Sequence, residues 1–226
     1  MPKKFLTFLV AVFLAVAAPA FAATDIHIKD FNGTSNFYRT LTFNQFNPAL
    51  GNLNSIHISL ALQSSGGTII IDNDADINAC GTFEFGANAG FSSADVSLGS
   101  IPNQIQAYNL LSIILSSNVG DDANDYSPLP PDGNEYNGGF VFDSKSGYVD
   151  NSLWGPYLGT DSYDFIVSVS QWSNYTGSGD IRYLINTPAS ISGNVTIVYD
   201  YTIPEPATIV LLAIGIFALL KRNRPF

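Results

Sequence analysis

The stretch Ile56-His57-Ile58-Ser59-Leu60-Ala61-Leu62 decides the fold class, because apolar side chains occupy every second position over seven residues. A period of two places one set of side chains on a core and the other in water, as in a half-buried β-strand. The stretch Val195-Thr196-Ile197-Val198-Tyr199-Asp200-Tyr201 has the same character near the other end of the chain. We therefore predict two long strands at these positions.

Shorter alternating runs lie between these two stretches, and polar clusters such as 63–67, 86–90 and 176–180 separate them. The region is rich in Asn, Ser, Gly, Tyr, Phe and Ile, a composition typical of strands and turns. Strands at about ten-residue intervals with such breaks predict an all-β fold, a single antiparallel, jelly-roll-like β-sandwich. Within this region only Gln104 to Leu115 is a helix candidate, and its Ile113-Ile114-Leu115 could equally be a buried strand.

The last twenty-three residues combine three features in order. They are Pro204-Glu205-Pro206, an uncharged apolar run over 207–220, and a basic end with Lys221, Arg222 and Arg224. As a helix the apolar run would be about 21 Å long, short of the roughly 30 Å hydrocarbon core of a bilayer. The basic cluster resists translocation and stays cytoplasmic. We therefore predict a C-terminal hydrophobic helix that halts in the inner membrane as a short transmembrane segment, with the prolines holding an extended link at its outer face.

This tail resembles the PEP-CTERM sorting signal of Gram-negative bacteria. The resemblance implies recognition by an exosortase, an integral-membrane enzyme, and removal of the tail, so that the mature protein lacks residues 207–226. The alternative is a plain tail anchor that contains Pro-Glu-Pro by chance.

The first twenty-two residues have the features of a secretory signal peptide. Pro2-Lys3-Lys4 is basic, Phe5 to Ala17 is an apolar run of thirteen residues, and Ala20 and Ala22 form an A-x-A cleavage site. The alternative is a first transmembrane helix, for which thirteen residues are too few. We therefore predict a signal helix at 1–22 cleaved after Ala22, a β domain at 23–203 and a sorting signal at 204–226. Export by the Sec route would give a membrane-tethered precursor, then a cell-surface or extracellular protein.

Between its two ends the chain is strongly acidic. Four basic residues, Lys29, Arg39, Lys145 and Arg182, face eighteen acidic ones, for a formal charge of −14. Such a chain repels phosphate backbones, which argues against nucleic acid as a partner. Cys80 is the only cysteine, so an intramolecular disulfide is excluded.

Three phrases resemble the choice-of-anchor E domain. They are Phe46-Asn47-Pro48-Ala49-Leu50-Gly51 before a long strand, Tyr175-Thr176-Gly177-Ser178-Gly179, and the closing strand Val195 to Tyr201. Asn47 stands where that family has Asp, and the polar insertion at 118–138 is longer than in the family. The resemblance implies a secreted β domain that occurs with different surface anchors, and no established chemistry.

Asp72, Asp74 and Asp76 are the strongest candidates for metal ligands, because alternate carboxylates on a tight loop suit a structural Ca²⁺ ion. An EF-hand also needs Gly and Glu where this chain has Ile77 and Phe83, so the loop is not an EF-hand. The alternative, which we favour, is a solvated acidic turn without a cofactor.

Catalytic residues are not indicated, because the chain has neither a G-x-S-x-G elbow nor an H-E-x-x-H motif. Trp154, Tyr157, Trp172 and Tyr175 could form an aromatic platform for sugars, and the alternative is packing in or beside the core. We therefore expect a non-catalytic cell-surface or extracellular-matrix protein, associated with exopolysaccharide or biofilm. A carbohydrate-binding module is the second hypothesis, and a secreted hydrolase with two converging carboxylates is the third.

Overall fold

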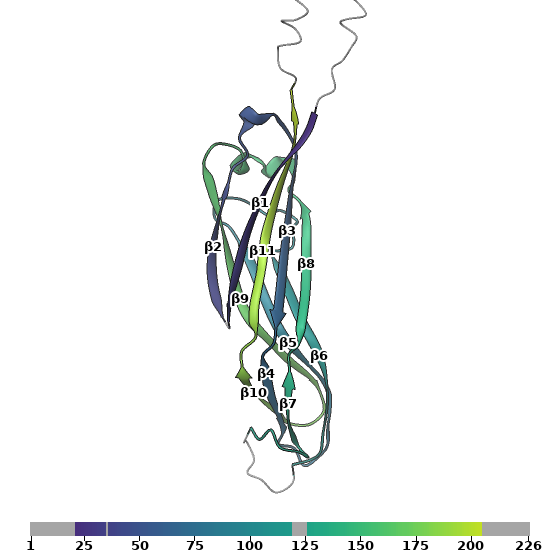
Figure 1. Cartoon of the computed structure of the whole chain (residues 1–226). Coiled ribbons are helices and arrows are strands. Elements are labelled where there is room, and N and C mark those ends of the chain that lie inside the picture. Colours follow the sequence, from purple (N-terminus) through teal and green to yellow (C-terminus); the bar gives the residue numbers. More distant parts are fainter. Residues whose placement is uncertain (1–20, 35, 119–125, 205–226) are drawn as a thin grey trace, which may run out of the picture.

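The computed structural model describes residues 21–34, 36–118 and 126–204, and its regular elements are strands and short 3-10 helices (Figure 1). An all-β antiparallel fold is therefore confirmed. The predicted signal helix and hydrophobic helix lie outside the described residues. The strands are β1 (Phe21–Thr34), β2 (Phe37–Asn44), β3 (Asn52–Ser65), β4 (Thr68–Asn73), β5 (Ala79–Ser92), β6 (Gln104–Leu115), β7 (Gly133–Asn137), β8 (Phe140–Tyr148), β9 (Ser162–Gly177), β10 (Ile181–Thr187) and β11 (Ser190–Ile203); the 3-10 helices are η1 (Pro48–Leu50), η2 (Asn151–Leu153) and η3 (Gly155–Tyr157).

Two four-stranded antiparallel sheets enclose the main core. The order is β1-β11-β3-β8 in the first, called the β1 sheet here, and β2-β9-β5-β6 in the second, called the β5 sheet. The chain crosses repeatedly between the two sheets, and the more specific jelly-roll-like topology stays a prediction. A third sheet, β10-β4-β7, is called the tip sheet because it lies at the far end of the molecule (Figure 1).

The alternation in the two long strands produces the core. In β3 the side chains of Ile56, Ile58, Leu60 and Leu62 are fully buried, and those between them face outward. In β11 the buried positions are likewise every second residue from Val195. Burying each such side chain contributes about 1.5–3 kcal/mol relative to leaving it exposed. The predicted strands at 56–62 and 195–201 are therefore confirmed.

The tip sheet continues the β1 sheet beyond a line of glycines. β3 runs into β4 through Gly66-Gly67, and β7 runs into β8 through Gly138-Gly139. The two pairs face each other, because Gly66 N donates to Gly139 O at 2.7 Å and Gly138 N donates to Gly67 O at 3.0 Å. The sequence predicts a turn at 63–67, but the chain continues there along one layer instead of reversing.

Backbone geometry explains why glycines occupy this line. Gly66, Gly67 and Gly139 have φ angles of 67°, 81° and 69°, a left-handed conformation that other residues adopt only with strain. At Gly138 a Cβ atom would lie 2.5 Å from the Phe85 ring of the opposite sheet. The β5 sheet has no such break, because β5, β6 and β9 continue past this level to the tip.

Two predictions along the β5 sheet need correction. Gln104–Leu115 forms strand β6 rather than a helix, which confirms the alternative given for 113–115; its run 110–115 lacks a period of two because both faces of the strand carry apolar residues. The predicted break at 86–90 lies inside β5, where Gly86 lets β6 approach closely: a Cβ there would meet the backbone oxygen of Ala107.

Candidate functional site

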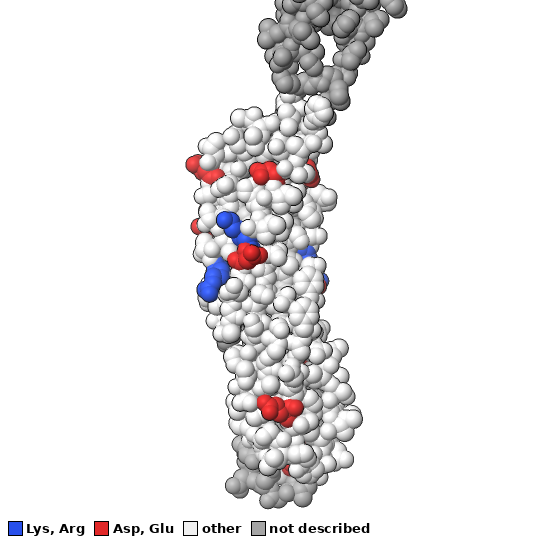
Figure 2. All heavy atoms as spheres, viewed as in Figure 1, with Lys and Arg blue, Asp and Glu red and all other residues white. Residues whose placement is uncertain are grey.

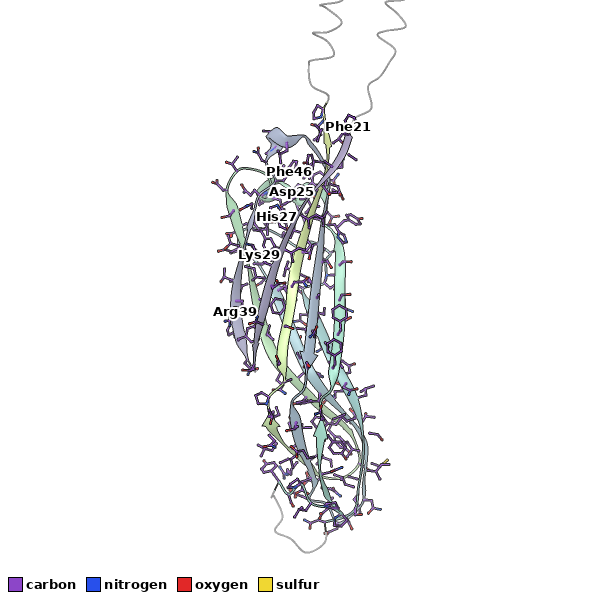
Figure 3. The ribbon with its side chains drawn as sticks, in the orientation of Figure 1. Phe21, Asp25, His27, Lys29, Arg39 and Phe46 are labelled. Atoms are coloured by element: carbon purple, nitrogen blue, oxygen red, sulfur yellow. The ribbon has the colours of Figure 1, made fainter. Side chains whose placement is uncertain are left out.

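The strands that connect to the two predicted delivery segments meet at one end of the molecule, called the sorting end here. β1 begins where β11 ends, and Phe21 pairs with Ile203 (Figures 1 and 3). Pro204 follows directly and is exposed. Signal peptide and sorting signal therefore join the domain side by side. The remaining predicted residues of these segments, namely Ala20, Glu205, Pro206, Lys221, Arg222 and Arg224, lie outside the described residues.

Ala22, the predicted last residue of the signal peptide, is the second residue of β1. Cleavage after Ala22 would remove it together with Phe21, whose side chain is 64% exposed. Ile203 pairs with Phe21 of β1 but with no residue of β3, because the first residue of β3 pairs with Thr202. After cleavage, the extended link before the sorting signal would therefore start at Ile203.

The three candidate calcium ligands occupy different environments where β4 ends. Asp72 is buried in β4, and Asp76 is exposed in the following loop. Asp74 Oδ2 accepts a hydrogen bond from Arg182 Nε at 3.2 Å, so a cation is already present as a guanidinium group. Across the described ranges, no group of three or more His, Cys, Asp or Glu is placed to hold a metal ion. Calcium binding stays a prediction.

Asn73 holds this turn together through hydrogen bonds. The spacing of the aspartates did not indicate this structural role. The buried side chain of Asn73 donates to Ile77 O at 2.8 Å and to Ser116 O at 2.7 Å. Its Oδ1 accepts from Ala75 N and Asp180 N, each at 3.3 Å. One amide thus ties together the β4–β5 loop, the end of β6 and the β9–β10 turn.

The four aromatic residues predicted as a sugar platform do not form one surface. Tyr157 is fully buried and donates to Ser97 O at 2.9 Å, while Trp154 packs against the main core and donates to Val149 O at 3.0 Å. Tyr175 packs on the second core, beneath the tip sheet. Trp172 alone points to the outer face of the β5 sheet, since its neighbours in β9 alternate inward.

On that outer face Trp172 shares a row with a residue that the sequence did not indicate. Gly86 of β5 pairs with Trp172 of β9 on one side and with Tyr108 of β6 on the other. Tyr108 is 38% exposed. It was missed because 104–115 was considered as a helix; read as a strand, the same run places residues 104, 106, 108 and 110 together on one face.

A buried tyrosine group closes the core near the sorting end. Tyr199 donates to Asn44 O at 3.1 Å and Tyr163 Oη lies 2.6 Å from Tyr199 Oη, so Tyr163 is left as the donor in that pair. Burial is the main cause that raises the pKa of Tyr199 to about 12, and burial raises the pKa of Tyr163 as well. Both phenols are therefore neutral at physiological pH and serve packing rather than proton transfer.

Charged side chains are sparse on the face where β1, β11 and β3 lie in front (Figure 2). On β1, Asp25, His27 and Lys29 follow one another away from Phe21, and Arg39 lies on neighbouring β2 (Figure 3). Asp25 Oδ2 and His27 Nε2 are 3.0 Å apart. These charges are mixed in sign, so the face has no basic patch that would bind an anionic polymer. The part of the chain that the structure describes contains no helix long and apolar enough to span a membrane.

Comparison with known proteins identifies the tail. Residues 202–224 match the model of the PEP-CTERM protein-sorting motif, which confirms the resemblance noted for the tail. This motif marks an exported protein of Gram-negative bacteria that is anchored in the membrane and processed by an exosortase. The choice-of-anchor E resemblance of the β domain is not shown by these matches. No curated protein matches the chain.

Solved structures give distant matches. A structure of the Gx strain of infectious bursal disease virus is 8% identical over 86% of this chain, with a TM-score of 0.15. A T13 particle of the same virus is 9% identical over 88% of this chain, with a TM-score of 0.13. The chain spans about half the length of those viral chains, 48% in both cases. TM-scores this low carry no argument about fold or function.

Proposed function

We propose that this protein is a non-catalytic cell-surface or extracellular-matrix protein, which an exosortase separates from its membrane tail and which then associates with exopolysaccharide or biofilm. The sorting motif at 202–224 supports the first part of this proposal. The inner membrane is then a transient partner, contacted through the predicted helix at 207–220.

The observation that carries the proposal is the position of the two chain ends. β1 begins and β11 ends at the sorting end, so a tethered precursor would project its tip away from the membrane. Residues 52–73 of β3 and β4 extend up to about 70 Å along this direction, at about 3.3 Å per residue. Both faces of the sandwich would then be available to extracellular material.

A pocket of the described structure lies beneath the β5–β6 loop, and the non-catalytic role proposed for the protein predicts that it performs no chemistry. This pocket, of about 450 Å³, is lined by residues between Phe91 and Asn103. Three serines, Ser92, Ser93 and Ser97, are among its lining residues, but these include no histidine, lysine or carboxylate that would activate a hydroxyl as a nucleophile.

Gene deletion tests the proposed function. A strain without the gene should form less biofilm or retain less polysaccharide at its surface, and the full-length gene should restore both. A variant with Pro204-Glu205-Pro206 changed to alanines should be made in equal amount but should not restore the phenotype. Unchanged biofilm and surface polysaccharide in the deletion strain would refute the proposal.

A carbohydrate-binding module is the second candidate function. The row Trp172, Gly86 and Tyr108 favours it, because it places two aromatic rings on one outer sheet face, where the nearby carboxylate of Glu84 accepts a hydrogen bond from Trp172.

A further inference from the structure

We propose that the outer face of the β5 sheet binds an uncharged hexose glycan, with Trp172 as the stacking platform and Tyr108 as the second aromatic contact. The proposed site is centred on Gly86 and includes the polar side chains of the adjoining rows. An uncharged hexose glycan is thus the ligand class for the proposed function. We rely on that function only for the location of the protein, which must be exported to reach the glycan.

The Trp172 indole is held in position by the protein. Its Nε1 donates to Glu84 Oε2 at 2.9 Å, and Glu84 lies on the neighbouring strand β5. To make this bond, the indole has to lean from β9 across β5. Gly86 is buried although it belongs to the outer face, because the β6 backbone lies against it: a Cβ there would meet Ala107 O. An indole oriented before binding loses little conformational entropy when a ligand stacks on it.

The spacing of the row suits a sugar. Trp172 and Tyr108 stand on either side of Gly86, two strand spacings or about 9.5 Å apart. Because Gly86 has no side chain, nothing rises between the two rings from the central strand. A pyranose can therefore stack on the indole while its edge contacts the Tyr108 ring.

Of the two neighbouring rows, one contains Asn174, Glu84 and Leu110, and the other supplies uncharged hydrogen-bonding groups. This second row consists of Ser170, Asn88 and Gln106. Asn88 Oδ1 is buried and has no hydrogen-bond partner among the described residues. Because this oxygen is buried, a sugar hydroxyl could reach it only if the Asn88 side chain turned outward, and the exposed amide of Gln106 is the group open to a sugar.

The few charged groups on this face favour a neutral glycan over a charged polymer as the ligand. Of the outward residues of β5, β6 and the facing part of β9, Glu84 is the one charged group, and its Oε2 already accepts from Trp172. Arginine or lysine is absent from this set, so an anionic polysaccharide would find no counter-charge. Leu110 and Ile114, which are 60% and 76% exposed, lie farther along β6 on the same face, so a second protein copy is the competing occupant that the test below distinguishes.

The test uses the full chain, purified from membranes of an exporting host in a detergent without a sugar headgroup. Cellohexaose, laminarihexaose and mannohexaose are titrated by calorimetry, with an alginate hexamer as the anionic comparison. Because the chain has two tryptophans, Trp154→Phe leaves Trp172 as the sole emitter, and its fluorescence should shift on binding. At least one neutral hexamer should bind, and the alginate hexamer should not.

Variants assign the binding to this face. Tyr108→Ala and Trp172→Ala should each weaken binding at least tenfold, while Trp172→Tyr, which keeps a ring, should lose less. Tyr148→Ala is the matched control, since Tyr148 is a 64% exposed tyrosine on the outer face of the β1 sheet. It should bind like the parent chain, and circular dichroism should show all variants folded.

Several results would overturn the inference. They are the absence of binding by all three neutral hexamers, binding by the Tyr108→Ala variant equal to that of the parent chain, loss of binding in the Tyr148→Ala control, or binding of the alginate hexamer alone. Self-association that blocks this face would instead assign it to a protein interface. Since purified protein is used, failure here leaves the biofilm test of the proposed function intact.

Discussion

Asn73 connects three segments at the tip through four hydrogen bonds. Its neighbours Asp72 and Asp74, in contrast, are the residues that the sequence suggests as metal ligands. Removal of the Asn73 side chain leaves two carbonyl oxygens and two amide groups without their partner. Because buried polar groups without partners cost about 1–3 kcal/mol each, such a residue affects stability more than an exposed amide does.

We predict that Asn73→Ala lowers the free energy of unfolding by about 2–3 kcal/mol, measured by urea denaturation. Asn174→Ala, which changes an exposed asparagine on β9, is the control and should stay within about 0.5 kcal/mol of the parent. Equal effects of the two substitutions would contradict the role given to Asn73.

The tyrosine pair predicts a loss of stability in alkali. In the folded chain Tyr199 has a pKa of about 12, against an ordinary value of 10, and burial raises the pKa of Tyr163 too. Between pH 10 and 12 the unfolded chain therefore binds fewer protons than the folded one, and stability falls as pH rises. The expected slope is up to about 1.4 kcal/mol per pH unit for each tyrosine.

Urea denaturation at pH 8, 10 and 11 measures this slope. Burial also raises the pKa of Tyr157, so Tyr163→Phe removes one of three such groups and should make the decline above pH 10 shallower. A parent protein with constant stability over this range, or a variant with an unchanged slope, would contradict the assignment.

At the scale of elements, the glycine line permits one sheet layer to continue while it changes direction. The loss of stability on substitution should differ among these glycines. Gly66 has open space where a Cβ would lie, whereas a Cβ at Gly138 would meet the Phe85 ring. A substitution at Gly66 therefore costs only backbone strain, of about 1–2 kcal/mol.

We accordingly predict that Gly138→Ala destabilises the protein by more than Gly66→Ala, both measured as changes in urea midpoint at a constant m-value. If Gly66→Ala were the more damaging of the two, the packing of Phe85 against the break would not be the deciding contact.

The long strands could be predicted from sequence, because β3 and β11 each have one face on the core and one in solvent. β6 could not, because Leu110, Ile113 and Ile114 place apolar residues on both of its faces. The breaks at 63–67 and 86–90 were misjudged because glycine there serves close approach and a left-handed backbone, and composition does not distinguish these uses from a reversing turn.

The candidate site was predictable only in part, for the same reason. Trp172 was recognised as a possible sugar contact, but its partner Tyr108 depends on pairing between strands that are far apart in sequence. Asn73 was likewise hidden, since its partners come from residues 77, 116 and 180. The sorting motif needed no such contacts, because it is read as a linear sequence.

At the scale of the whole molecule, the described structure places the start of β1 and the end of β11 together and the tip far from both. Cys80, the only cysteine, is exposed and lies near the tip, where its backbone oxygen accepts from Ser178 N. Chemical labelling of the Cys80 thiol therefore shows on which side of the inner membrane the domain lies.

We predict that a membrane-impermeant maleimide labels Cys80 of the tethered precursor in intact spheroplasts of a host without exosortase. A Cys80→Ser variant should remain unlabelled. Labelling that requires lysis of the spheroplasts would place the domain in the cytoplasm and contradict export.

If both chain ends serve delivery and are removed, the intact mass of the protein recovered from a host with an exosortase should show that both are missing. We expect a chain that begins at Ala23 and lacks residues 207–226, found outside the inner membrane, and the tailed form in a host whose exosortase gene is deleted. A full-length chain of 24.3 kDa in the cytosol of the exosortase-containing host would contradict this expectation.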